Sequence, residues 1–167
     1  MLFPVSNLII RLAKKISGVK DDERDDSVVS LDDRMLQTPS LALQATVGEV
    51  ARMGAIVNET LDAAKRVLFT LSEEDIHTLK EDEFKVDKLT AGVTDYAIKI
   101  TGLQIGEKEH QQVAHLLQIV SDIERVSDYC ENISEFAETL KEKKLSFSET
   151  GKEEIKEMIC LLYTSPS

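Results

Sequence analysis

Residues 119–140 read IVSDIERVSDYCENISEFAETL, and this stretch decides the fold. Apolar or small side chains recur there in alternating steps of four and three residues, at Ile119, Ile123, Val126, Cys130, Ile133, Ala137 and Leu140. Such spacing is typical of a long helix that packs against other helices along its whole length. Glu124 and Asp128 lie one turn apart directly beside this apolar line, where a solvated acid is not expected. The sequence therefore predicts a packed helix that carries two carboxylates at its interface.

Length and composition favour a single all-α domain. The chain has 167 residues with only 7 Gly, 3 Pro and no Trp, which suits helices and one domain. Its net charge of -11 would repel a phosphate backbone, so nucleic acid is excluded as a partner. Two cysteines are too few for a disulfide framework, and Cys130 is predicted to be a buried, reduced thiol.

Three long helices with short connections are predicted to pack as an antiparallel bundle. Thr38 and Pro39 suit the N-cap and first position of the first helix. The sequence SEED at 72–75 is a capping pattern that separates the first helix from the second. The second helix is expected to stop near Gly106, a C-terminal glycine, and the third to run over about 107–144.

The ends of the chain differ from this bundle. Residues 1–20 are apolar and then basic, and the apolar run is shorter than the roughly 20 residues that span a bilayer. They form either a free amphipathic segment or the end of a membrane helix whose beginning is missing, with the cations on the cytoplasmic side. We expect an acidic linker over 21–37, the bundle over 38–145, and the start of a truncated, partial fourth helix over 146–167.

A second pair of acids is predicted to face the first. Glu83 and Asp87 lie on the second helix with the same spacing as Glu124 and Asp128. If the hairpin turns at Gly106, Asp87 is roughly 28 Å and Glu124 roughly 27 Å from the turn, at about 1.5 Å per residue. Four carboxylates at one level repel each other unless a cation lies among them. Because all the ligands are oxygens, iron, manganese, magnesium or calcium is favoured.

Two other interpretations compete with this metal site. Charged residues on helices usually face solvent or form surface ion pairs, here with Lys85, Lys88 and Arg125. Two Glu-x-x-His sequences, which end at His77 and His110, are typical of di-iron carboxylate bundles. One histidine lies far from the predicted turn and the other almost on it, so the two cannot share a metal.

The acidic motifs resemble those of the PhoU family. Residues 124–133, ERVSDYCENI, are similar to the family signature E-R-I-G-D-x-x-x-N-I, with Ser127 in the place of the Gly. The acids at 83–87 resemble the companion motif on the preceding helix, and Met-Gly at 53–54 matches the usual M-G. The resemblance covers about 38–144.

This resemblance implies an α-helical, non-enzymatic regulator of phosphate uptake. It places metal-binding roles on the four carboxylates named above, commonly for iron clusters, and makes Asp122 and Asn132 weaker candidates. PhoU proteins contain two three-helix bundles, whereas this chain has one.

The single bundle behind an apolar and basic segment resembles a junction in bacterial sodium/phosphate cotransporters of the type II-related family. There a PhoU-like domain follows the last membrane helix on the cytoplasmic side. The chain would then be a fragment whose partner is the membrane domain in cis, and self-association stays open. The alternative is a free-standing PhoU-type regulator of a phosphate ABC transporter and its sensor kinase.

Overall fold

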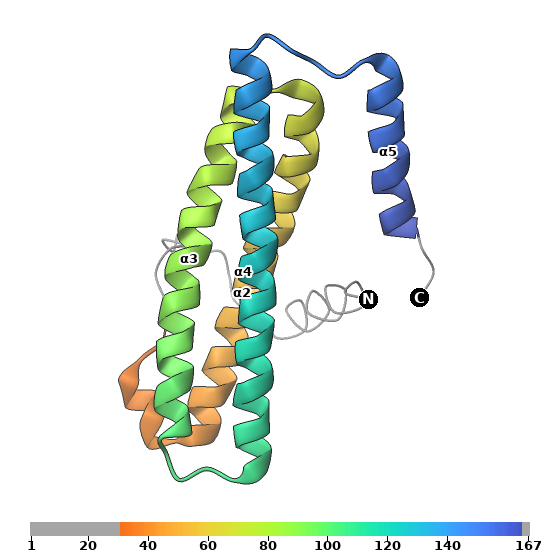
Figure 1. Ribbon diagram of the computed structural model, residues 1–167. Coiled ribbons are helices and arrows are strands. Elements are labelled where there is room, and N and C mark those ends of the chain that lie inside the picture. The colour runs from red at the N-terminus through yellow and green to blue at the C-terminus, as the bar shows by residue number, and fades with distance from the viewer. Residues whose placement is uncertain (1–30, 165–167) are drawn as a thin grey trace, which may run out of the picture.

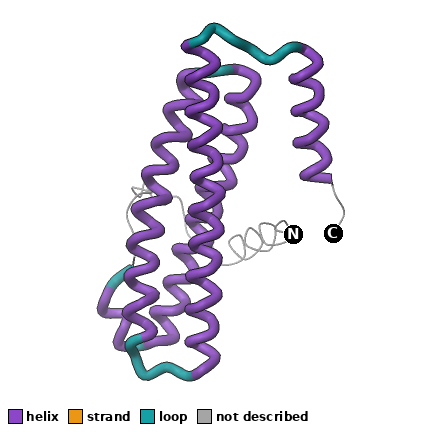
Figure 2. The backbone as a smooth tube through the Cα atoms, in the orientation of Figure 1, coloured by secondary structure: helices purple, strands orange, loops and turns teal. Residues whose placement is uncertain are grey.

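The computed structural model describes residues 31–164, with side chains described as far as residue 160. Every element in this range is helical (Figures 1 and 2): a short 3-10 helix η1 (Asp33–Gln37), then α2 (Pro39–Thr70), α3 (Glu73–Thr101), α4 (Glu107–Glu142) and α5 (Glu149–Thr164). Consecutive helices from α2 to α4 run antiparallel, and all three pack on one another. The predicted all-α, three-helix bundle is therefore confirmed.

The first helix boundaries follow from local chemistry. Pro39 occupies the first position of α2 behind the N-cap Thr38. Between α2 and α3, Leu71 adopts a left-handed conformation with φ 49°, and the Ser72 side chain accepts a hydrogen bond of 3.3 Å from the backbone N–H of Asp75. The capping pattern thus ends one helix and starts the next, as predicted.

The turn between α3 and α4 differs from the prediction. α3 already ends at Thr101 with Gly102 as its C-cap, whereas Gly106 is the N-cap of α4. The backbone N–H of Gly106 donates a hydrogen bond of 2.5 Å to the Glu109 carboxylate. A Cβ at Gly106 would lie 2.9 Å from that carboxylate, so glycine lets Glu109 close the start of α4. Gly106 therefore lies at a helix start and not at a helix end.

The buried line of α4 differs in part from the predicted apolar line over 119–140. On α3 the core positions are large apolar residues: Leu79, Val86, Leu89, Val93, Tyr96 and Ile100. On α4 the buried line instead contains several small residues: Val120, Ile123, Ser127, Cys130, Ser134 and Ala137. The bulkier Ile119, Val126 and Ile133 are only half-buried at its edge. Small side chains therefore make up much of the buried face of α4.

The bundle has two apolar clusters, one on each side of a polar layer. The larger cluster, at the α3–α4 turn, includes Met53 and Leu89, and the smaller one, at the α2–α3 turn, includes Leu79. Between them the buried Thr60 hydroxyl lies 3.2 Å from the Asp82 carboxylate of α3. This layer divides the core at mid-length.

Part of the predicted linker packs on the bundle. Residues 33–37 form η1, which contacts α2 and α3. The Tyr96 hydroxyl donates a hydrogen bond of 2.9 Å to the Asp32 carbonyl, and the Lys99 ammonium lies 2.8 Å from the Asp33 carboxylate. The predicted end of a membrane helix, over 1–20, lies outside the described residues. Within 31–164, no helix is both long enough and apolar enough to cross a bilayer.

The fourth long helix, α5, stands beside the bundle and adds little to its core (Figure 1). The Phe147 ring, just before α5, lies 6.1 Å from the Phe136 ring of α4. The Lys156 ammonium lies 5.6 Å from the Phe69 ring of α2. These contacts hold α5 near the α2–α3 turn end of the bundle.

The core assignment predicts a large effect at Leu89, which is fully buried. Leu89→Ala should lower the free energy of unfolding by about 2–5 kcal/mol through lost burial and a residual cavity. Ile98→Ala on the same helix, where the side chain is 57% exposed, should change it by less than about 0.5 kcal/mol. Urea unfolding followed by circular dichroism measures both, and equal losses would contradict this core.

Candidate metal centre

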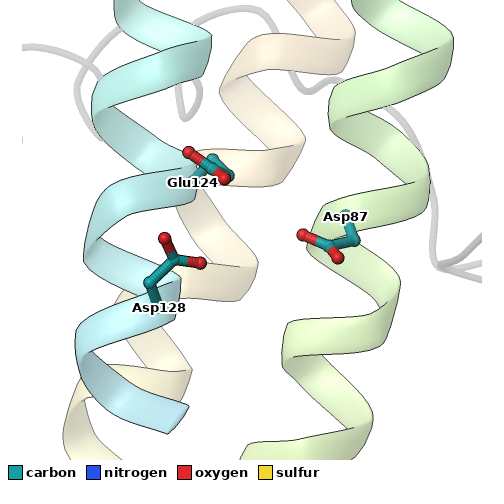
Figure 3. A group of neighbouring side chains, drawn as sticks. All are labelled: Asp87, Glu124 and Asp128. Carbon is teal, nitrogen blue, oxygen red and sulfur yellow. The ribbon is translucent and has the colours of Figure 1, made fainter. Parts of the chain in front are cut away.

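Three carboxylates converge in the groove between α3 and α4 (Figure 3). Asp87 comes from α3, and Glu124 and Asp128 come from α4. One oxygen of each carboxylate lies within 4.8 Å of the other two. Figure 3 shows the Asp87 side chain directed across the groove toward the other two. Glu124 and Asp128 are half-buried and Asp87 is exposed, so the group is reachable from solvent.

The register between α3 and α4 puts these acids at one level. The Lys141 ammonium lies 2.5 Å from the Glu73 carboxylate, close to the far end of the hairpin. Both helices rise about 1.5 Å per residue, so equal steps toward the turn keep residues opposite each other. Ten steps from this pair bring Glu83 opposite Glu131. Fourteen steps bring Asp87 opposite Ser127, the residue before Asp128, and Asp128 is a member of the cluster with Asp87.

Glu83 lies next to the cluster without being one of its three members. Burial is the largest cause that raises the pKa of Glu83 to about 7, and the negative charges of Asp87 and Glu131 and a hydrogen bond with Asp87 contribute to this rise. The fourth predicted ligand therefore lies beside Asp87 and outside the group of three. The protonated form is the one that donates this hydrogen bond.

Glu131 belongs to this acidic region, and the sequence analysis missed it. Its charge acts on Glu83 across the groove. The signal was present, because 124, 128 and 131 follow the four-three spacing of one helix face. Only acids four residues apart were considered, so the three-residue step from Asp128 to Glu131 was missed.

The acids of α4 experience mutual repulsion. Burial raises the pKa of Glu124, and the negative charges of Asp128 and Asp87 add to the rise. The Arg125 charge lowers the pKa, but as the smallest of these contributions. The charged form of Glu124 is thus disfavoured where it lies.

The neighbouring lysines do not pair with the three carboxylates. The Lys85 ammonium lies 2.9 Å from the Asp82 carboxylate, and the Lys88 ammonium lies 4.2 Å above the Phe84 ring. Within residues 31–164, no ion pair joins a Lys or Arg to a member of the cluster. Surface ion pairing is therefore not the arrangement found for these acids.

The weaker candidates do not join the cluster. Asp122 accepts a hydrogen bond of 3.3 Å from a side chain of its own helix. The Asn132 amide donates a hydrogen bond of 2.9 Å to the backbone carbonyl of Asp128 and is exposed. His77 and His110 are exposed and lie toward opposite ends of the hairpin, so the di-iron pattern is not formed.

The donor set suits a hard divalent cation. Ions such as Mg²⁺, Mn²⁺ and Ca²⁺ take oxygen ligands at about 2.0–2.6 Å, which allows roughly 3–5 Å between ligand oxygens. The 4.8 Å limit on the cluster lies at the wide end of that range, and small side-chain rotations would close it. The three residues can therefore hold one cation that links α3 to α4.

Comparison with known proteins identifies the family of this chain. The family model described as "PhoU domain" matches residues 50–137, more than half of the chain, and this range includes both acidic motifs. The chain belongs to the PhoU family. It is 26% identical over 160 residues to "Putative inorganic phosphate export protein YjbB" of Salmonella typhimurium (strain LT2), over 92% of this chain and 28% of that protein.

A second relative is "Phosphate-specific transport system accessory protein PhoU homolog" of Synechocystis sp. (strain PCC 6803). It is 28% identical over 97 residues, which cover 58% of this chain and 43% of that protein. The chain thus spans less than half the length of either relative. No solved structure matches it.

The Glu83 pKa predicts how the stability of chelator-treated protein depends on pH. The folded-state pKa of about 7 lies above the reference value of 4.5, so the folded chain binds this proton more tightly than the unfolded chain. The resulting stability is fully present below about 4.5 and is lost as pH rises through about 7. The melting temperature should therefore fall across this range.

Glu83→Gln, which cannot ionise, should flatten this fall, and Glu59→Gln at an exposed position of α2 should leave it unchanged. Differential scanning calorimetry in steps of pH measures the slopes. Parallel slopes for the Glu83 variant and the unaltered protein would disprove the assignment.

Proposed function

We propose that this chain is a regulatory, non-enzymatic PhoU domain of a sodium-dependent phosphate cotransporter, attached on the cytoplasmic side of the membrane. Its membership of the PhoU family and the name of the Salmonella relative, which refers to inorganic phosphate export, support a role in phosphate transport. The apolar and then basic sequence of residues 1–20 supports attachment to a membrane domain. The partner would be that membrane domain in the same polypeptide.

The observation that carries the site is the convergence of Asp87, Glu124 and Asp128 with no cationic side chain paired to them in the described residues. We propose that the three carboxylates hold iron or another divalent cation. Bound there, the cation would supply positive charge that cancels their repulsion. The reduced negative charge would lower the raised pKa of Glu83 and so favour release of its proton.

The chain's own residues give this binding a structural consequence. Asp87 lies on α3, and Glu124 and Asp128 lie on α4, so all three are drawn together only when the two helices keep their register. A bound cation would favour close approach of α3 and α4 at this level. Without the cation, repulsion between the carboxylates would favour separation of the two helices. A regulatory domain needs such a difference between two states, because a ligand shifts an equilibrium only by its differential affinity.

The alternative function is that of a free-standing PhoU-type regulator of a phosphate ABC transporter and its sensor kinase. The Synechocystis relative, whose name refers to a phosphate-specific transport system, favours it. The two functions differ in the coding sequence before Met1. The cotransporter requires several membrane helices there, whereas the free-standing regulator requires none.

Metal binding is tested with a double variant and a matched control. Asp87→Asn, Asp128→Asn removes two charges from the cluster and should lower Mn²⁺ affinity at least tenfold, because amides replace anionic ligands. Asp95→Asn, Asp122→Asn removes two charges from the same helices outside the cluster and should change affinity less than about twofold. Isothermal titration calorimetry measures both, and metal analysis of the purified proteins should agree. Equal Mn²⁺ affinity in the three proteins would exclude the site.

The transport role is tested in cells that produce the full-length protein from the complete gene. Deletion of residues 31–145 should leave phosphate flux intact and abolish its response to external phosphate, because the domain is proposed to regulate transport without forming the path. Uptake and efflux of radiolabelled phosphate measure this response. Loss of flux itself, or an unaltered response, would contradict a regulatory role.

A further inference from the structure

Thr90 lies on the face of α3 that points toward α4. Positions 80, 83, 87 and 90 follow the three-four-three spacing of one helix face. Two of them contact α4 directly: the Lys80 ammonium lies 2.7 Å from the Glu138 carboxylate, and Asp87 joins the carboxylate cluster. Thr90 is one turn beyond Asp87 on this face.

The register places Thr90 at about the level of Glu124. Asp87 lies close to both Glu124 and Asp128 across the hairpin, so it is about level with position 126. Three steps toward the turn on each helix lead to Thr90 and to about position 123, next to Glu124. Thr90 is therefore the residue of α3 level with the cluster's most turn-proximal carboxylate.

The Thr90 hydroxyl is buried and makes no hydrogen bond within the described residues. Threonine in a helix commonly donates to the carbonyl four residues earlier. Thr46 and Thr78 do so here, at 2.8 and 2.9 Å. Thr90 does not form this bond, so its Oγ1 remains a donor without an acceptor. A buried polar atom of this kind costs free energy until it finds a partner.

Glu124 is the acceptor that the geometry offers. It is half-buried, it is level with Thr90, and a carboxylate that binds a cation through one oxygen retains lone pairs for a hydrogen bond. We propose that Thr90 is a positioning residue, whose hydroxyl donates a hydrogen bond to the Glu124 carboxylate and orients it for cation binding. This inference rests on the proposed metal site and adds a residue to it that touches no metal.

Burial and the negative charges of Asp128 and Asp87 disfavour the charged form of Glu124. If the three carboxylates bind a cation, the Thr90 hydroxyl would hold the Glu124 carboxylate in the orientation that binding needs. Hydrogen-bond partners of metal ligands typically change metal affinity 10–100-fold when they are removed.

The test compares three single variants by calorimetric titration with Mn²⁺ and by thermal unfolding of the chelator-treated proteins. Thr90→Val keeps the shape and removes the hydroxyl, and should weaken Mn²⁺ binding about tenfold or more. Thr90→Ser restores a hydroxyl and should stay within about threefold of the unaltered protein. Thr94→Val is the control, because the same spacing puts Thr94 at about the level of the apolar Val120 and not of an acid.

A purely structural role for Thr90 would change the melting temperature of the metal-free protein and leave the Mn²⁺ affinity alone. That result, or equal affinities for the Thr90 and Thr94 valine variants, would overturn the inference while the metal site stands. Failure of the unaltered protein to bind Mn²⁺ would overturn both. If Thr90→Val does not fold, Thr90→Ala replaces it in the test. Weaker Mn²⁺ binding by folded Thr90→Ala, with near-normal binding by Thr90→Ser, supports the inference, and unchanged binding by Thr90→Ala overturns it.

Discussion

The register between α3 and α4 is the constraint on which the site depends. A slip of one residue would shift one helix by about 1.5 Å and turn its side chains by about 100°, which would take Asp87 away from Glu124 and Asp128. The ion pairs Glu73–Lys141 and Lys80–Glu138 join the two helices, but their levels differ by four residues, and both pairs are exposed and contribute little to stability. Fully buried side chains between the helices must therefore fix it. They hold carboxylates together that would otherwise separate.

The sequence could predict that the acids of α3 and α4 lie at about the same distance from the turn. This distance depends only on the number of residues along each helix and not on how the helix is rotated. The predicted turn at Gly106 was wrong, since the connection spans 102–106 and Gly106 starts α4. That error moves the register by about two residues, or roughly 3 Å, which is less than one turn. It was small enough that Asp87, predicted to be level with Glu124, lies close to both Glu124 and Asp128. Glu131 was missed for a separate reason, because only acids four residues apart were considered.

Rotation about the helix axis could not be predicted from the apolar spacing. The apolar spacing put Ile119, Val126 and Ile133 in the α4 interface together with Cys130, but the three bulky residues are only half-buried, whereas Ser127 and Ser134, which lie outside the predicted line, are buried. Hydrophobic periodicity measures where large apolar groups recur, whereas closely packed helices place small side chains at the contact and larger ones at its edges. The serine that replaces the signature glycine is 1% exposed. That position needs a small side chain for packing.

The position of the site between two unequal apolar clusters suggests why it can act as a regulator. On the side of the α3–α4 turn, the core contains Met53, Leu89 and many branched residues, whereas the other cluster includes Ala63 and Ala137 among its few members. Burial contributes about 25 cal/mol per Å², so the small-residue end is held by less free energy and should open first. A link between α3 and α4 at the boundary would strengthen the weaker end and leave the stronger one almost unaffected. A change in charge at the carboxylates would therefore mainly alter the stability of the α2–α3 turn end, which is also the end of the bundle that α5 contacts.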